Sequence, residues 1–289
     1  FYSINEKMSP SKSIHLRGPA MEPNFFSIID KQTEWKFEDD NERSSRMLKN
    51  FINHDIPVLI QTDIFYLDYY NSSTHFPGHV VSVWGYDDES REFFLSDTGF
   101  SGLKSISYES LSKARSSQAQ PYPLRNNWIE VVLEPPIPPL SELIPRAILN
   151  NAKSMLEGRK NSRGISSVNT IRLWAKQLKD WYVTPDWQWS TRFAYQVIEK
   201  RGTGGGGFRF MYRDFLIEAQ EIIPVINELK LVEKMDLLGT KWSDISIILR
   251  RISDSEKDFQ LFKQVSKKAE EIAELEETFY SEINDRLIS

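Results

Sequence analysis

The sequence predicts an α+β domain built on an antiparallel sheet, followed by an all-α helical bundle. Short strand-like runs dominate the first 134 residues, a proline cluster follows, and beyond it apolar residues recur at spacings of three and four. The cluster at residues 134–139 (EPPIPP) forbids helix and central strand. We therefore place the sheet domain at residues 1–134, a linker at 135–141 and the helical domain at 142–289.

The first domain is expected to contain four strands and two helices. The strand-like runs are rich in β-branched and aromatic residues and are bounded by Gly, Asp and Ser; they cover residues 58–63, 79–84, 92–97 and 127–133. An apolar stripe of Met47, Leu48, Phe51 and Ile52 predicts a helix over residues 42–53, and a second helix is expected over 108–115.

Six helices are expected in the second domain, because each segment carries an apolar stripe of helical period; they cover residues 140–157, 166–181, 187–201, 208–229, 232–252 and 255–287. The last segment is rich in Glu and Lys, with one continuous stripe of Phe259, Phe262, Val265, Ala269, Ile272, Leu275, Phe279, Ile283 and Leu287. Its charged side is interpreted as a solvated face, or as the surface of a partner helix in a homodimer.

Composition excludes several classes of function. Hydrophobic residues make up 40% of the chain, which is ample for a buried core. The net charge of −5 provides no general basic field for nucleic acid. The longest apolar runs are too short to span a bilayer, and no secretion signal is visible, so we expect no membrane contact and a cytoplasmic location.

The 289 residues contain no cysteine, which excludes disulfides and thiol nucleophiles within them. The chain opens on Phe1 without an initiator Met, which is compatible with a processed N-terminus or with an omitted earlier segment.

His75 and His79 are four residues apart, but the Phe-Pro-Gly between them breaks any helix, so we predict no metal site.

His79 and Asp97 form the candidate catalytic pair. His79 opens one strand and Asp97 ends the next, and two adjacent antiparallel strands place these positions at the same sheet edge. A carboxylate bound to one imidazole nitrogen fixes the tautomer and leaves the other nitrogen to activate a nucleophile. The alternative is a surface histidine near an unrelated aspartate.

The segments around this pair resemble a known family. Residues 78–87 (GHVVSVWGYD) and 94–98 (FLSDT) are similar to the His/Asp half of papain-like enzymes, and more narrowly to the N-terminal domain of the butirosin biosynthesis protein H family. Further similar stretches are residues 16–18, 57–63, 66–69, 114–117 and 123–128. Residues 202–209 (GTGGGGFR), continuing through Tyr212, resemble the helical domain of unknown function that follows in that family.

The resemblance implies a papain-like thiol acyltransferase of antibiotic biosynthesis. Such an enzyme moves an acyl group from a carrier-protein phosphopantetheine thioester to a small-molecule amine through an acyl-cysteine, with no other cofactor. On this basis His79 is the base and Asp97 orients it. The family places its cysteine on an N-terminal segment, and we expect that segment to be missing from this sequence. The alternatives are a cysteine amidase or peptidase, and a cysteine-less binding protein on the same scaffold.

Three further residues are candidates for substrate binding. Asp63, at the end of a strand, is either a polar wall of the acceptor pocket or a turn-capping aspartate, and we favour capping. Tyr66 is a candidate through the resemblance. Arg209 follows the glycine run 202–207, where it could bind an anion such as the pantetheine phosphate. The run itself lacks the strand–loop–helix order of a phosphate loop, so we interpret it as a helix connection with close backbone approach.

Overall fold

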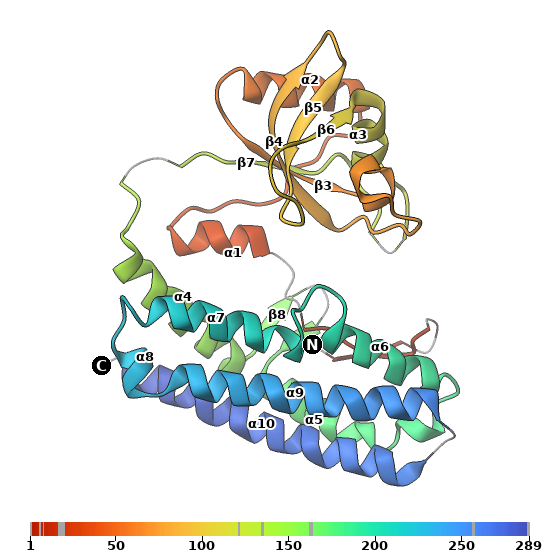
Figure 1. Ribbon diagram of the computed structural model, residues 1–289, viewed down its shortest axis with the longest axis vertical. Coiled ribbons are helices and arrows are strands. Elements are labelled where there is room, and N and C mark those ends of the chain that lie inside the picture. The colour runs from red at the N-terminus through yellow and green to blue at the C-terminus, as the bar shows by residue number, and fades with distance from the viewer. Residues whose placement is uncertain are drawn as a thin grey trace. The chain divides into compact units, whose positions relative to one another are not determined.

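The computed structural model describes residues 2–5, 7, 9–16, 21–120, 122–133, 136–161, 164–255 and 258–287 (Figure 1). The chain forms two compact units. One unit, here the sheet unit, comprises Glu22–Ile137, and the other, the helical unit, comprises Phe1–Met21 together with Pro138–Ser289. The predicted α+β class is confirmed, and the second part is helical apart from one short strand pair.

A five-stranded antiparallel sheet in the order β6-β5-β4-β3-β7 forms the sheet unit (Figure 1). Its strands are β3 (Val58–Thr62), β4 (His79–Asp87), β5 (Glu92–Ser96), β6 (Lys104–Ser107) and β7 (Trp128–Glu130). The register shifts between Val83 and Gly85, so Trp84 lies at a bulge in β4. Two short 3₁₀ turns, η1 (Ile64–Tyr66) and η2 (Asp68–Tyr70), connect β3 to β4.

Alternate residues of the central strands are buried and pack against two helices. Val58, Ile60, Val81, Val83 and Leu95 share one hydrophobic core with Leu48 of α2 (Asn41–Ile52) and Leu111 of α3 (Tyr108–Arg115). Each of these helices begins at an N-cap side chain. Asp40 accepts a hydrogen bond from Arg43 N at the start of α2, and Ser107 accepts one from Ser110 N at the start of α3. A further short helix, α1 (Met21–Ile28), was not predicted.

The helical unit contains α4 (Leu140–Glu157), α5 (Val168–Leu178), α6 (Trp187–Glu199), α7 (Arg209–Ala219), α8 (Val225–Glu228), α9 (Leu231–Asp254) and α10 (Phe259–Leu287). Short elements lie between these helices: β8 (Arg159–Asn161) pairs with β9 (Gly164–Ser166), and η3 (Trp181–Val183) follows α5. The predicted helix over 208–229 is wrong as one piece: α7 ends at Ala219, because Pro224 cannot continue a helix from the residues before it.

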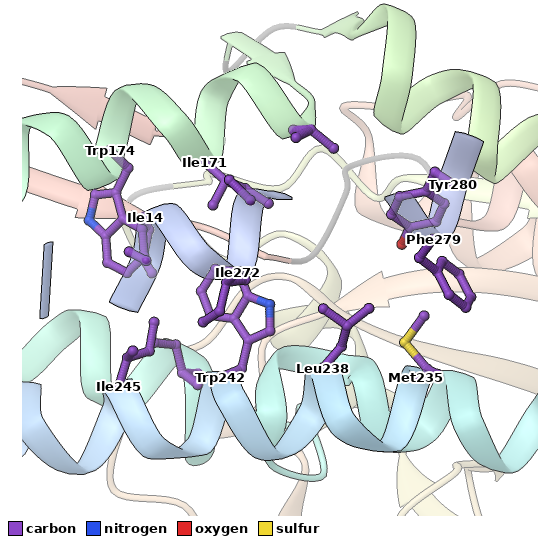
Figure 2. Packing of buried hydrophobic residues seen from close by; sticks show 14 of the residues in the cluster. Ile14, Ile171, Trp174, Met235, Leu238, Trp242, Ile245, Ile272, Phe279 and Tyr280 are labelled. Carbon is purple, nitrogen blue, oxygen red and sulfur yellow. The ribbon is translucent and has the colours of Figure 1, made fainter. Parts of the chain in front are cut away.

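Aromatic and aliphatic side chains fill the core of the helical unit (Figure 2). The rings of Trp174 and Trp242 are stacked with centroids 5.8 Å apart, and both side chains are almost fully buried. The apolar stripe of α10 is buried against α5, α9 and α4 of the same chain. This intrachain packing accounts for the stripe without a partner helix.

The N-terminal hairpin, β1 (Tyr2–Ile4) with β2 (Lys12–Ile14), belongs to the helical unit and not to the sheet domain in which the sequence placed it. Ser11 donates to Asp186 from both its backbone N (2.7 Å) and its Oγ (2.5 Å). The Tyr2 hydroxyl donates to Gln177 Oε1 at 2.8 Å, and Ile14 is buried in the helical core. These contacts join residues far apart in sequence, so local pattern could not assign the hairpin.

The glycine run ends in η4 (Gly206–Phe208), a 3₁₀ turn packed against α9. A Cβ on Gly206 would lie 2.8 Å from the backbone oxygen of Gly239, and the φ angle of Gly206 is +53°. The run therefore provides close backbone approach, as expected. None of the helices in the described ranges combines the length and apolarity that a membrane span needs.

Candidate functional site

His79 and Asp97 meet at the end of the sheet. His79 is the first residue of β4, and Asp97 directly follows β5, its hydrogen-bonded neighbour. His79 Nε2 and Asp97 Oδ2 lie 2.8 Å apart. The Asp97 side chain is fully buried, whereas the His79 side chain remains 17% exposed. The structure thus brings together the two residues that strand order alone had placed side by side.

Three further groups hold the Asp97 carboxylate. The Tyr69 hydroxyl donates to Oδ2 (3.0 Å), while Gly99 N (3.1 Å) and the Tyr70 hydroxyl (3.4 Å) donate to Oδ1. Burial alone would raise the pKa of this carboxyl, but hydrogen bonds from His79, Gly99 and Tyr69 outweigh burial and hold the pKa below its ordinary value. Asp97 is therefore an ionised acceptor for the imidazole.

Sequence reasoning missed Tyr69 and Tyr70 as partners of Asp97. Burial and the negative charge of Asp97 raise the pKa of both phenols, so each remains a protonated donor. Phe100 packs edge-on against both rings, with centroids 5.1 Å and 5.0 Å away. The adjacent tyrosines between β3 and β4 were a visible signal, but only the fold of η2 shows that they turn toward Asp97.

The second nitrogen of His79 is available to a further group. Nδ1 has no hydrogen-bond partner among the residues that the structure describes, while Nε2 is held by Asp97. When Nε2 carries the proton donated to the carboxylate, Nδ1 presents a lone pair and can accept a proton from another group. The pair is thus arranged as an oriented general base.

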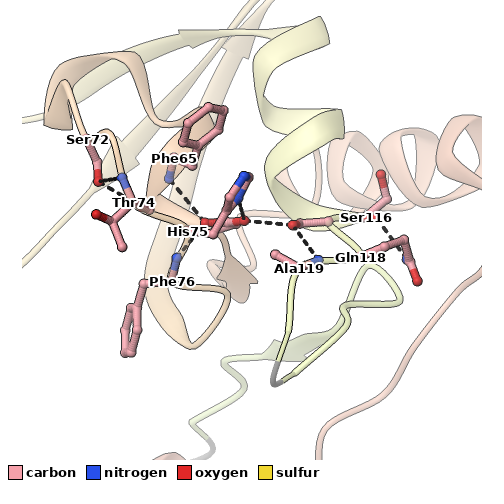
Figure 3. A network of polar contacts seen from close by, with 10 residues as sticks. Phe65, Ser72, Thr74, His75, Phe76, Ser116, Gln118 and Ala119 are labelled. Carbon is pink, nitrogen blue, oxygen red and sulfur yellow. Dashed lines mark hydrogen bonds and ion pairs between the residues drawn. The ribbon is translucent and has the colours of Figure 1, made fainter. Parts of the chain in front are cut away.

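A second polar network includes His75, Phe65 and Phe76 (Figure 3), and all three donate to the carboxylate of Asp63. Its fully buried carboxylate accepts from four donors: His75 Nδ1 (2.7 Å), Ser117 Oγ (2.7 Å), Phe76 N (2.8 Å) and Phe65 N (3.2 Å). Burial favours a raised pKa, but these hydrogen bonds prevail and lower it. Both oxygens face protein donors, so Asp63 caps η1 and does not line an open pocket wall.

Tyr66 and His75 lie beside each other on this network. Their ring centroids are 5.7 Å apart, and Tyr66 is half-buried. The His75 side chain is 42% exposed and forms the second histidine–aspartate pair of the unit, which sequence reasoning did not find. Nothing in the local pattern links Asp63 to a histidine twelve residues later.

Arg209 is placed differently from the expectation that it binds an anion. Its guanidinium is paired with the fully buried Glu276, with Nη2–Oε1 at 2.6 Å, and its Nη1 donates to Gly207 O at 2.6 Å. It also lies over the Trp242 ring, 4.9 Å from the centroid. These contacts occupy the side chain within the helical core, so Arg209 stabilises the glycine turn and is not available to a ligand.

In the described ranges, no three His, Cys, Asp or Glu residues gather closely enough to hold a metal ion. An antiparallel α+β unit that carries an oriented His79 with a buried carboxylate behind it has the parts that proton transfer at a sheet edge requires. Arg209 lies in the helical unit and its own hydrogen bonds are to Glu276 and Gly207, so it takes no part in this pair.

Comparison with protein families identifies the chain further. Residues 1–98 match the family described as Butirosin biosynthesis protein H, N-terminal, and residues 109–283 match the Domain of unknown function (DUF4872). The chain therefore belongs to the butirosin biosynthesis protein H family, with both of its domains in the family's order. This membership supports an enzyme-like role in secondary metabolism. Among curated proteins no match was found.

The two matched regions do not coincide with the two compact units. The second match begins at residue 109, so most of α3 and all of β7 fall in it although both pack in the sheet unit. The hairpin β1–β2 falls in the first match although it packs in the helical unit. Each matched region thus contributes residues to both units.

Proposed function

We propose that the protein is a thiol-dependent acyltransferase of secondary metabolism, in which His79 and Asp97 form the proton-transferring half of the site. The single observation that carries this proposal is the 2.8 Å contact between His79 Nε2 and a buried, ionised Asp97, with Nδ1 unbound by any described residue. This is the arrangement that a thiol nucleophile requires of its base. The family's characterised chemistry supports a carrier-protein thioester as donor and an amine as acceptor.

The proton steps follow from this geometry. His79 Nδ1 takes the thiol proton, and the thiolate attacks the donor thioester carbonyl. The imidazolium, stabilised by Asp97, returns the proton to the departing pantetheine thiolate. The acyl group is then on the enzyme sulfur and His79 is neutral again. An amine attacks, His79 accepts a proton from it, and the same proton goes to the enzyme sulfur as the carbon–sulfur bond breaks.

The nucleophile in this scheme lies outside the 289 residues, because these contain no cysteine. The proposal assigns it to the N-terminal segment on which the family carries its cysteine. A thiol there would be ionised by the neighbouring imidazole in the way that cysteine–histidine pairs require.

The test uses the protein produced from the complete gene. Its intact mass is measured before and after treatment with a thiol alkylator, and acyl transfer is assayed from an acyl-pantetheine to a primary amine. We expect one alkylated cysteine and turnover that falls by about 10²–10⁴-fold in His79→Ala, the range of general acid–base catalysis. His54→Gln is the matched control, because His54 lies in the same unit and its imidazole contacts a backbone carbonyl, Asn50 O.

Retained folding of His79→Ala is checked by circular dichroism. Unchanged turnover in this variant, or a complete protein without any alkylatable cysteine, would refute the acyltransferase proposal.

A further inference from the structure

The His75–Asp63 pair has the same parts as the His79–Asp97 pair. In each, one imidazole nitrogen lies within 2.8 Å of an oxygen of a fully buried aspartate, and the other nitrogen has no hydrogen-bond partner within the described chain. In His75 the bound nitrogen is Nδ1, so the remaining nitrogen is Nε2, at the tip of the ring. The side chain of His75 is more exposed than that of His79, at 42% against 17%.

Both pairs depend on one loop at one end of the sheet. Thr62, the last residue of β3, pairs with His79, and its Oγ1 donates to His79 O at 3.1 Å. Just beyond this pairing, Ile64 N donates to Phe76 O at 3.3 Å. His75 and His79 are four residues apart on the returning limb, so their Cα atoms lie at most ~14 Å from each other.

The surroundings of His75 are aromatic and half-open. The Phe65 ring stacks on the imidazole with centroids 4.1 Å apart and is 41% exposed. Phe76, 45% exposed, projects from the same network (Figure 3), and its ring lies 3.5 Å from where a Cβ of Gly78 would be. These rings offer apolar surface for the carbon skeleton of a ligand beside an imidazole that can accept a proton.

Transfer of an acyl group to an amine needs two proton acceptors. A primary alkylamine reaches the site mainly as an ammonium ion at neutral pH, and it must lose one proton before it can attack and another after it has attacked. In the scheme above His79 accepts only the later proton, which it passes to the enzyme sulfur. The first proton has no acceptor in the His79–Asp97 pair.

We propose that His75, oriented by Asp63, binds the acceptor ammonium through its Nε2 and takes the first of these protons. This inference rests on the proposed function and deepens it, because it assigns the acceptor side of the site. The nitrogen–proton bond of the ammonium breaks, the proton joins His75 and later leaves to solvent, and the freed lone pair forms the carbon–nitrogen bond. Overall, acyl-enzyme and ammonium give amide, free thiol and one proton.

The charged surroundings of His75 are compatible with this role. Asp63 is the ionised group in contact with the ring, and Tyr66 is the neighbouring phenol. Lys113 of α3 interacts electrostatically with Tyr66 and with Asp68 of η2, and it is paired with Glu109. The imidazolium that forms is stabilised by the buried carboxylate behind it.

The experiment separates acylation from transfer in the complete protein. Acyl-enzyme is formed from an acyl-pantetheine, freed of excess donor, and mixed with either an alkylamine or methoxyamine. Methoxyamine is a weak base that is unprotonated at neutral pH. The variants are His75→Asn, whose amide nitrogen takes the place of Nδ1 and keeps a donor for Asp63, and His54→Gln as the control. Acylation is followed by mass and transfer by the rate of amide formation.

We expect His75→Asn to form acyl-enzyme normally and to lose about 10²-fold in transfer to the alkylamine at neutral pH. Transfer to methoxyamine should be unchanged. The deficit with the alkylamine should disappear as the pH rises past the pKa of the amine itself, because free amine then needs no base. A merely structural role for His75 would slow both acceptors at every pH.

Equal loss with both acceptors, or no loss with either, would overturn the assignment of His75 while leaving the acyltransferase intact. Failure of the wild-type protein to form any acyl-enzyme would overturn the proposed function, and the role of His75 with it. The two failures are therefore distinguishable.

Discussion

Tyr69 and His79 donate to the same oxygen of Asp97, Oδ2, at 3.0 Å and 2.8 Å. The phenol therefore shares one carboxylate oxygen with the imidazole and helps to hold the carboxylate beside His79. Because Tyr69 lies in η2, the position of Asp97 depends on the fold of the loop between β3 and β4 as well as on β5.

Tyr69→Phe should raise the pKa of Asp97 and destabilise the sheet unit by about 2 kcal/mol at neutral pH, because a hydrogen bond to a charged group is lost. The pKa of Asp97 is depressed in the folded state. Its contribution to stability is therefore present above the unfolded-state pKa and lost as the pH falls through the folded-state pKa. In the variant the pKa of Asp97 is depressed less, so the midpoint of acid unfolding should move to higher pH. Urea titrations at a series of pH values will measure this shift.

Tyr86→Phe is the control for this prediction. Its hydroxyl donates to Asn53 Oδ1 at 3.0 Å in an exposed contact. If Tyr69→Phe and Tyr86→Phe have the same acid-unfolding midpoint as the wild type, Tyr69 does not stabilise the Asp97 carboxylate.

Asp63→Asn should loosen the loop between β3 and β4, which carries His75 and ends at His79. An amide cannot accept from His75 and Ser117 through its nitrogen, so buried donors lose their partner, at a cost of about 2–3 kcal/mol. Chemical denaturation gives the free energy of unfolding, and hydrogen exchange over residues 64–76 reports the loop. Asp68→Asn, at an exposed position of η2, should change neither; equal stability of the two variants would contradict the role given to Asp63.

Gly206→Ala should destabilise the helical unit by about 2–4 kcal/mol. The new Cβ would lie 2.8 Å from Gly239 O while the residue keeps a φ of +53°, so steric overlap adds to backbone strain. Gly102→Ala is a matched control, because Gly102 also has positive φ (+69°) but nothing lies within 4 Å of where its Cβ would be. It should cost only about 1 kcal/mol. Thermal unfolding compares the stability of the two variants. Equal losses of stability would refute close packing at Gly206 as the cause of the destabilisation.

Ile14→Ala tests whether the N-terminal hairpin is part of the helical core. The side chain is 3% exposed in that core, so its truncation should cost about 2–5 kcal/mol. Hydrogen exchange should quicken in α5 and α6, with the sheet unit unaffected. Ile4→Ala, a strand residue of the same hairpin that is 52% exposed, should leave both units as they are. Faster exchange in β3 and β4 instead would assign the hairpin to the sheet unit.

The sequence was informative where a local pattern decides the structure. Proline chemistry predicted a linker at residues 135–141, and the two compact units divide between Ile137 and Pro138. Alternation and turn residues located β4 and β5, and antiparallel pairing then placed His79 beside Asp97. The strand β6 was missed because its four residues, KSIS, hold a single buried apolar side chain, Ile106.

The remaining features depend on contacts that no local window contains. The interpretation of Arg209 as an anion site is wrong because its partner, Glu276, lies 67 residues further along in a helix with its own charged pattern. His75 was considered only as a metal ligand, since its link to Asp63 arises from the closure of the β3–β4 loop. Charged and polar partners of this kind are set by tertiary folding, which residue spacing does not encode.

The placement of the hairpin β1–β2 with the helical unit makes the sheet unit an insertion within the helical unit. During synthesis on the ribosome, every residue of the sheet unit has been added once Ile137 is made, so its sheet can form early. The hairpin β1–β2 is translated before the sheet unit. Its hydrogen bonds to Gln177 and Asp186 can form only after α5 and the residues up to the start of α6 have been translated. The hairpin can therefore contact its native partners in the helical unit only after the whole inserted sheet unit has been translated.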